Sequence, residues 1–208
     1  MMNKNIFIWH NYRSGSTAYQ SLLSKKYNLK NYYEPFHERQ IGVHDTENFF
    51  NQTAIDPSKF IVKATPLHIE QIIHRTTLHY NFKKEINKLL ESSHIILITR
   101  KNRVESIASM YVATITSKWF ETRDSHKENM NYEMSIDENI LQKICQEYLD
   151  NDKLLQKKSF DEKVVYEDLD LRDSNYIKQT KPKNYNDMIE QIHTYIKKEF
   201  KHLLGDKK

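Results

Sequence analysis

Cysteine is almost absent from this 208-residue chain, which carries only Cys145. A single cysteine excludes an intrachain disulfide, so the sequence indicates a protein that folds in a reducing compartment. Long apolar runs are also lacking near the start, where Lys4 and His10 flank a segment too short for a signal peptide or a membrane span. We therefore expect a cytoplasmic protein with no membrane partner.

The sequence also lacks long runs of one charge sign. Its 32 basic and 28 acidic residues are interspersed and give a formal net charge of +4. Such a balance suits a small anionic ligand and argues against nucleic acid as a partner. Hydrophobic residues make up only 38%, but 13 Tyr and 9 Phe supply large apolar side chains. Length and composition together predict one domain spanning residues 1–208.

Short apolar runs rich in β-branched or aromatic residues predict buried strands. Four such runs are clear, and a fifth candidate is weaker. They cover residues 6–9, 60–62, 95–98 and 164–166, with 29–33 as the weaker one. Helical patterns separate these runs. Strands that alternate with helices predict an α/β fold of three layers, in which a mainly parallel sheet is flanked by helices on both faces.

Three helices have clear signals in the sequence. Apolar residues recur at helical spacing over residues 104–115, and Asn102 is the expected N-cap. A second helix is expected after Ser135, which has capping-box spacing to Glu138. The last apolar stripe covers residues 185–203.

The turn after the first predicted strand contains one of only three glycines in the chain. It reads Arg13, Ser14, Gly15, Ser16 and Thr17. A glycine lets backbone N–H groups converge on an anion beyond the carboxyl end of a strand, and the following helix adds its N-terminal dipole. An ordinary capped helix after a turn is the alternative interpretation. The Walker pattern of ATP-binding loops requires lysine after its second glycine, and Ser16 stands there instead.

These five residues resemble the loop that binds the 5′-phosphosulfate in sulfotransferases, in the variant typical of the bacterial trehalose-sulfotransferase-like branch. Residues 98–104, continuing to Ser109, are similar to the family's strand-to-helix motif for the 3′-phosphate. Residues 32–36 resemble the segment with a catalytic glutamate, and 165–169 resemble a strand-end signature. The resemblance implies a P-loop-NTPase-like sulfotransferase fold and 3′-phosphoadenosine 5′-phosphosulfate (PAPS) as co-substrate.

The resemblance implies that a basic residue and a downstream serine hold the 3′-phosphate of PAPS. Arg100 and Lys101 are both candidates, because the family's usual spacing of eight residues to Ser109 begins at Lys101. On a helical wheel, Ser109 borders the apolar stripe, whereas Ser106 falls nearly opposite it. An Arg-Lys-Gly signature near the C-terminus is missing. Its charge can come instead from three lysines: Lys178, Lys181 and Lys183.

Sulfuryl transfer resembles phosphoryl transfer, so the protein mainly positions the reactants and stabilises charge. The resemblance implies that Arg13 contacts the bridging and sulfuryl oxygens of PAPS. Glu34 is the expected base for the acceptor hydroxyl, and His37 and His68 are rival bases. Lys63 ends a predicted strand. Its side chain either points to the same carboxyl edge of the sheet as Glu34 or is solvated.

No His, Cys, Asp or Glu cluster in the sequence has convincing zinc spacing, so we expect no metal. Glu167 and Asp168 are adjacent on a predicted strand and would face opposite ways, which favours structural roles. The expected acceptor is a small molecule or glycan, bound by residues 36–50 and 119–133. Its identity and the oligomeric state stay open. The alternatives are a P-loop-type nucleotide-dependent kinase and a non-catalytic nucleotide- or nucleic-acid-binding module.

Overall fold

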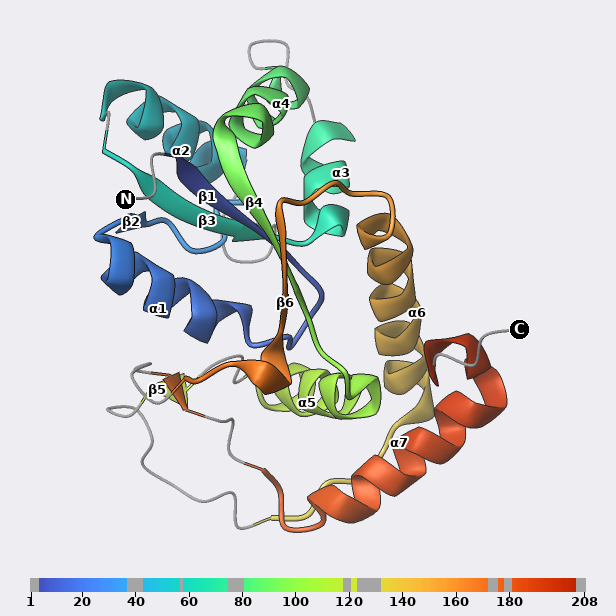
Figure 1. The fold of residues 1–208 in the computed structure, drawn as a ribbon. Helices are drawn as coiled ribbons and strands as arrows, with labels where there is room; N and C mark the ends of the chain where they lie inside the picture. The colour runs from blue at the N-terminus through green and yellow to red at the C-terminus, as the bar shows by residue number, and fades with distance from the viewer. Residues whose placement is uncertain are drawn as a thin grey trace.

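A parallel five-stranded sheet forms the centre of the fold (Figure 1). The computed structural model describes residues 4–36, 43–56, 58–74, 81–117, 121–122, 132–171, 176–177 and 181–204. The strands of the sheet are β1 (Asn5–His10), β2 (Lys30–Asn31), β3 (Phe60–Ala64), β4 (Ser93–Thr99) and β6 (Glu162–Val165), in the order β2-β3-β1-β4-β6. The prediction of an α/β fold with a parallel sheet is confirmed.

Six of the seven described helices lie between strands along the chain, and α7 follows the last strand. The helices are α1 (Ser16–Tyr27), α2 (Val43–Ile55), α3 (Pro66–His74), α4 (Phe82–Ser92), α5 (Arg103–Thr116), α6 (Glu138–Leu155) and α7 (Tyr185–Glu199). Two short 3₁₀ turns, η1 (Tyr166–Asp168) and η2 (Lys201–Leu204), follow β6 and α7. A small antiparallel pair joins β5 (Glu121–Thr122) to β7 (Tyr176–Ile177).

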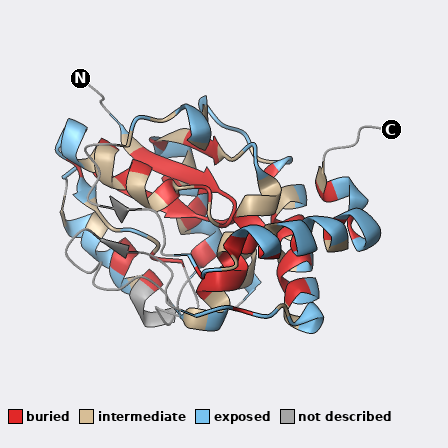
Figure 2. Cartoon of the chain, turned by 90° about the horizontal axis from the view of Figure 1, so that it is seen from below, coloured by how far each residue is buried: buried red, intermediate tan, exposed pale blue. Residues whose placement is uncertain are grey.

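Both faces of the central sheet are buried, which explains why its strands read as continuous apolar runs. On one face Ile6 and Ile8 pack with Tyr19 and Leu23 of α1. On the other face β1 and β3 pack against residues of α2, α3 and α4. Figure 2 shows the strands as buried at the centre of the fold. Each fully buried large side chain stabilises the fold by about 1.5–3 kcal/mol.

A third apolar cluster lies among α5, α6 and α7, which gather at one end of the molecule (Figure 1). Ile107, Tyr148 and Ile192 represent the three helices in this cluster. Tyr12, from the segment that follows β1, is also a member. The cluster therefore packs directly against the chain where it leaves the central strand.

A buried amide joins α6 to the end of β1. The Nδ2 of Asn151, a residue that is 0% exposed, donates to the carbonyl of His10 at 3.3 Å and to Oδ1 of Asn11 at 3.0 Å. Its Oδ1 accepts the N–H of Leu67 at 3.2 Å. Asn11 in turn donates to the carbonyl of Tyr148 at 3.3 Å. These bonds fix the backbone where the loop after β1 begins.

The helix starts agree with the sequence in one case and differ in another. Asn102 caps α5 as expected, since its side chain accepts the N–H of Glu105 at 3.0 Å. The cap of α6 is Asp137, so the prediction of Ser135 is wrong. The reason is that the carbonyl of Ser135 accepts the hydroxyl of Tyr111 at 3.1 Å, which holds Ser135 in the segment before the helix.

Two element ends also differ from the sequence expectation. The strand predicted over residues 164–166 ends at Val165, and Tyr166 begins η1. The last helix stops at Glu199, and Leu203 lies buried in η2 instead of continuing the helix.

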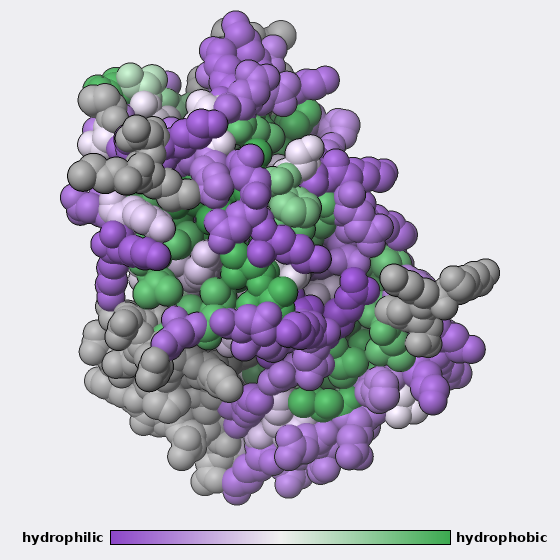
Figure 3. Space-filling model, in the orientation of Figure 1, coloured by the Kyte–Doolittle hydropathy of each residue, from purple (hydrophilic) through white to green (hydrophobic). Residues whose placement is uncertain are grey.

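The face of the molecule seen in Figure 3 is largely hydrophilic, with apolar residues visible between polar ones. None of the described helices is both long and apolar enough to cross a bilayer.

We predict that Asn151→Ala lowers the free energy of unfolding by about 1–3 kcal/mol, because it leaves buried backbone groups without hydrogen-bond partners. Urea denaturation measures this loss. Gln142→Ala, at an exposed position of the same helix, is the matched control and should change stability by less than about 0.5 kcal/mol. Equal effects of the two variants would contradict a structural role for the amide.

Candidate functional site

The candidate site lies at the carboxyl end of β1, where the order of the strands reverses. β1 pairs with β3 on one side and with β4 on the other. The chain runs from β1 to β2 and β3 on one side, then crosses to β4 and β6 on the other. Ligands of open α/β sheets bind beyond the strand ends at such a switch point. The loop predicted to bind an anion, residues 13–17, follows directly after this end of β1, which closes at His10.

The loop backbone adopts a shape suited to binding an anion. Arg13 and Gly15 both have left-handed conformations, with φ of 56° and 75°. Turns of this kind direct successive N–H groups into one concavity. For Arg13, which is not glycine, the conformation costs roughly 1–2 kcal/mol. Packing of the surrounding structure must therefore hold the loop in this shape.

The start of α1 leaves hydrogen-bond donors available. Its N-cap is Gly15, which makes no side-chain cap, and its first turn contains no acidic residue. Within the described residues, the Ser14 hydroxyl has no hydrogen-bond partner, although Ser14 is only 1% exposed. A buried hydroxyl without a partner is costly, so a ligand that accepts from it would be favoured. Ser16 is buried and Thr17 is half-buried beside it.

Tyr166 covers the loop at Gly15. A Cβ atom at Gly15 would overlap the Cδ2 and Cε2 atoms of the Tyr166 ring. The guanidinium of Arg100 lies 4.9 Å from the centre of the same ring. Gly15 is therefore required both for its left-handed backbone and for the close approach of the ring.

The structure separates the two basic candidates for the 3′-phosphate. Arg100 faces the loop, because its Nη1 donates to the carbonyl of Arg13 at 3.1 Å. Lys101 turns away, since its side chain is 64% exposed and its Nζ lies 2.9 Å from Oδ1 of Asp168. Among these two residues, Arg100 is the one next to the loop.

Ser109 lies against the predicted anion loop. The Nε of Arg13 donates to the Oγ of Ser109 at 2.9 Å, which joins the two predicted phosphate-binding segments across 96 positions of sequence. The wheel argument on Ser106 is wrong, because Ser106 is fully buried and lies beside Tyr148. Helices α6 and α7 both cover α5, so its buried face is wider than its apolar stripe.

A carboxylate lies between two of the predicted cations. Glu105 contacts Arg100 at 2.8 Å through Oε2 and Lys181 at 3.3 Å through Oε1. Burial opposes ionisation of Glu105, but the charges of Arg100 and Lys181 hold its pKa below the usual range. Lys183, the predicted phosphate contact, is exposed and donates its backbone N–H to the carbonyl of Tyr132. Of these two lysines, Lys181 is the one beside Glu105.

Glu167 caps the start of α5. Its carboxylate accepts the backbone N–H groups of Lys101 and Asn102 at 2.9–3.1 Å. Burial would raise the pKa of Glu167, but these N–H donors and Arg100 lower it overall. The contacts of Glu167 and Asp168 fit structural roles. Both residues lie in η1 and not on a strand, so the strand argument for those roles was wrong.

Glu34 lies in a cluster with two basic side chains from neighbouring strands. Its Oε2 is 2.7 Å from Nζ of Lys63, and its Oε1 is 2.9 Å from Nε2 of His10. Lys63 and His10 are buried, and the Glu34 side chain stays 22% exposed. Glu34 is therefore the most exposed side chain of the three. Lys63 thus points to the same edge and is not solvated.

The backbone around Glu34 explains its position. Tyr33 has a left-handed φ of 54°, and its carbonyl accepts the N–H of Lys63 at 2.9 Å. Gln20 of α1 also donates to this carbonyl, at 3.1 Å. Pro35 follows Glu34, and its carbonyl accepts the hydroxyl of Thr46 at 2.8 Å. The turn is held from α1, β3 and α2 together.

The electrostatic balance keeps Glu34 ionised. Burial would raise the pKa of Glu34, but the charge of Lys63 and the hydrogen bond from His10 outweigh burial and hold the pKa well below its usual range. Burial, followed by the charge of Lys63, lowers the pKa of His10 although Glu34 opposes this change. Glu34 alone is therefore a weak proton acceptor.

Of the two rival bases, the structure describes His68. His68 is buried on α3, and its Nε2 lies 3.3 Å from the hydroxyl of Tyr12. Burial raises the pKa of Tyr12, with further contributions from Glu147, so this hydroxyl stays neutral. His37, Lys178 and Trp119, the first residue of the predicted acceptor-binding segment 119–133, fall outside the described residues.

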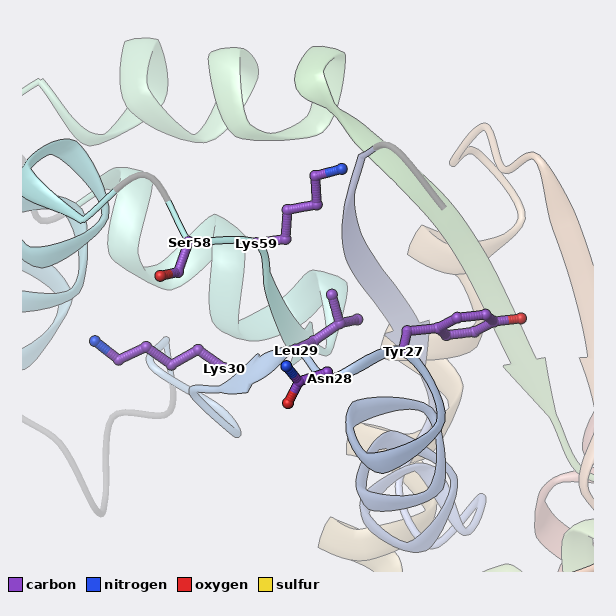
Figure 4. A pocket seen from close by; sticks show the side chains of 6 residues that line it. All are labelled: Tyr27, Asn28, Leu29, Lys30, Ser58 and Lys59. Carbon is purple, nitrogen blue, oxygen red and sulfur yellow. The ribbon is translucent and has the colours of Figure 1, made fainter. Parts of the chain in front are cut away.

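Within the described parts of the chain, no group of three or more His, Cys, Asp or Glu residues could hold a metal ion. An open hollow of about 510 Å³ lies at the opposite end of the sheet, between the end of α1 and the start of β3. Lys30 and Lys59 extend in different directions there, so their charges do not converge on one ligand (Figure 4).

Reasoning from the sequence missed two site residues, His10 and Tyr166. His10 continues the alternation of Ile6 and Ile8 on one face of β1, which is the signal that could have identified it. Tyr166 has no local signal, because its position over Gly15 depends on contacts 151 residues apart.

We predict that Gly15→Ala destabilises the protein through backbone strain and through overlap with Tyr166. In a protein with Tyr166→Ala, the overlap is gone and only the backbone strain of Gly15→Ala remains. A double-mutant cycle of the two substitutions should therefore give a coupling energy of about 0.5–3 kcal/mol. Thermal unfolding of the four proteins measures it. Phe160→Ala, which removes an exposed aromatic residue of the same region, is the control and should show no coupling. An additive cycle for Tyr166 would contradict the contact.

A second prediction concerns acid. Because the pKa of Glu34 is lowered on folding, its stabilising effect is present above the unfolded pKa of about 4.3 and disappears as the pH falls. The difference in unfolding free energy between wild type and Glu34→Gln should therefore shrink between about pH 5 and pH 3. Glu91→Gln, at an exposed carboxylate of α4, is the control. A constant difference for Glu34 would contradict its pairing with Lys63 and His10.

No family model matches the chain, and no curated protein matches it. Among solved structures, the fold is similar to the crystal structure of an uncharacterized protein from Eubacterium ventriosum ATCC 27560. The TM-score is 0.37 and the identity 13%, over 94% of this chain and 99% of that one. A similarity of this size carries no argument about function.

Proposed function

We propose that the protein is a sulfotransferase that moves a sulfuryl group from PAPS to a hydroxyl of a small-molecule or carbohydrate acceptor. The bond from Arg13 to Ser109 is the observation that carries this proposal. It brings together two segments that resemble the 5′-phosphosulfate and 3′-phosphate motifs of that family. PAPS carries anionic groups at both positions, whereas ATP has no 3′-phosphate.

The loop after β1 supports binding of the 5′-phosphosulfate. The left-handed turns at Arg13 and Gly15, the uncapped start of α1 and the Ser14 hydroxyl all supply donors to one anion. Ser16 and Thr17 begin α1 and can add hydroxyl donors. The guanidinium of Arg13 would stabilise charge on the bridging and sulfuryl oxygens during transfer.

Arg100 and Ser109 are the residues that we assign to the 3′-phosphate. Both contact Arg13, one at its carbonyl and the other at its side chain. When PAPS binds, its 3′-phosphate would compete with Arg13 for Ser109 and with Glu105 for Arg100. Lys181, which pairs with Glu105, is the further cation that such a phosphate would meet.

Glu34 is the base in this proposal. Its partial exposure lets an acceptor hydroxyl approach. A lone pair of the acceptor oxygen forms the new O–S bond, and the O–H electron pair stays on that oxygen as its proton passes to Glu34. The electron pair of the broken S–O bond stays on the 5′-phosphate of the product, 3′-phosphoadenosine 5′-phosphate (PAP). The protein forms no covalent bond to the substrates in this step, so its contribution to the rate comes mainly from positioning them.

We predict that PAP stabilises the purified protein against heat and that ADP and AMP do so far less. At 100 times its Kd, PAP should raise Tm by roughly 5–10 °C. Arg13→Ala should lower the rate of labelled sulfate transfer from PAPS by about 100-fold, equivalent to about 3 kcal/mol. Arg13→Lys should lie between, because it keeps the charge and loses the planar fork. Lys26→Ala, at the far end of α1, should match wild type.

Three other results would contradict the proposal. Mg²⁺-dependent ATP binding without preference for a 3′-phosphate would favour a kinase. Tight, salt-sensitive oligonucleotide binding that Arg13→Ala leaves unchanged would favour a nucleic-acid-binding module. PAP binding without transfer to any of a broad panel of sugar and alcohol hydroxyls would indicate a donor-binding protein without catalysis.

A further inference from the structure

The side chain of Gln20 on α1 is an amide enclosed by the protein. Gln20 is 0% exposed. Its Nε2 donates to the carbonyl of Tyr33 at 3.1 Å and to the carbonyl of Ile61 at 3.4 Å. Both partners are backbone oxygens, which only accept, so the NH₂ group faces them and Oε1 points the other way. The direction of the amide is therefore fixed by its contacts.

The oxygen of this amide has no hydrogen-bond partner within the described residues. A buried acceptor without a donor lowers the stability of a protein. The two carbonyls have other donors, because that of Tyr33 also accepts the N–H of Lys63 at 2.9 Å. The carbonyl of Ile61 likewise accepts the N–H of Tyr32 at 3.1 Å. The need to pair backbone groups thus does not explain a glutamine at position 20.

The amide connects the two halves of the candidate site. Gln20 lies one helical turn after Ser16, where the loop predicted to bind an anion continues into α1. Tyr33 directly precedes Glu34, the proposed base. The bond from Nε2 to the carbonyl of Tyr33 therefore runs from the helix of the anion loop to the turn that carries the carboxylate.

Apolar packing alone is a weak restraint on the distance between α1 and this turn. Tyr19 and Leu23 of α1 pack against β1. Apolar attraction is non-directional, whereas a hydrogen bond weakens steeply away from its preferred distance and angle. Gln20 therefore adds a directional restraint that the neighbouring apolar side chains do not supply.

We propose that Gln20 is a positioning residue that sets the distance between Glu34 and the sulfuryl group held by the anion loop. This inference rests on the proposed sulfotransferase function. In-line transfer requires the acceptor oxygen, bound at Glu34, to approach sulfur opposite the leaving 5′-phosphate oxygen. A displacement of about 1 Å can lower the rate of such a step by about 100-fold. Gln20 touches neither reactant, because it is buried, and acts through the turn before Glu34.

Gln20→Met tests this role, because methionine has a similar length and lacks both polar amide atoms. We expect a Tm no more than roughly 3 °C below wild type, since the unpaired acceptor disappears together with the two bonds. The Kd for PAP should stay within about 2-fold of wild type, and kcat should fall by about 10–100-fold. Gln142→Met, at an exposed position of α6, is the matched control and should keep all three wild-type values.

Three results with Gln20→Met would overturn the assignment. The first is a wild-type kcat. The second is a fall in kcat that an equal loss of PAP binding accompanies, because the anion loop itself would then be disturbed. The third is a larger loss of Tm, which would show that the amide serves folding.

A second measurement needs no substrate. If Gln20 holds Glu34 in place, Glu34→Gln should lower Tm in the Gln20→Met protein by roughly half as much as in wild type. In the Gln142→Met protein, Glu34→Gln should keep its full effect. Equal effects in all three backgrounds would refute the restraint on Glu34. If wild-type protein neither binds PAP nor transfers sulfate, the proposed function fails, and this coupling alone then decides whether Gln20 positions Glu34.

Discussion

The structure depends on the burial of β1 between two parallel neighbours. Every residue of this strand except the first is buried, and ladders to β3 and β4 satisfy its backbone on both sides. Such a strand can end only where its last polar groups find partners inside the protein. Asn151 supplies them at the carbonyl of His10, and the strained loop can therefore begin at a fixed point. The position of Arg13 follows from that fixed end.

The basic side chains around the loop are paired with carboxylates and carbonyl groups of the protein, so they do not form a bare basic surface. Arg100 is bound to Glu105 and to the carbonyl of Arg13, and Lys63 is bound to Glu34. Pairing of buried or half-buried cations limits the cost of removing them from water. It also keeps the site assembled without a ligand. The overall charge of +4 is thus a poor guide to the local field at the loop.

The sequence predicted the sheet well because continuous apolar runs are the direct consequence of burial on both faces. It also identified the loop, since a scarce glycine followed a strand. It could not predict that Lys63 is buried, because a lysine is ordinarily solvated and its partner Glu34 is brought to it only by the register of β2 and β3. The helical wheel did not predict the burial of Ser106 for a related reason. A wheel assumes that one side of a helix is covered, whereas α6 and α7 cover α5 on two sides. Contacts such as Tyr166 on Gly15 require the tertiary fold itself.

Glu105 has a consequence for the dependence of binding on ionic strength. A phosphate that enters between Arg100 and Lys181 replaces a carboxylate already held there, so the local charge that attracts it is smaller than the two cations alone would give. Dissolved salt screens exposed charges over about 8 Å at physiological concentration. Affinity at this position should therefore change less with salt than at an uncompensated pair of cations. Selectivity would then come from the shape and hydrogen bonds of the site, which salt leaves in place.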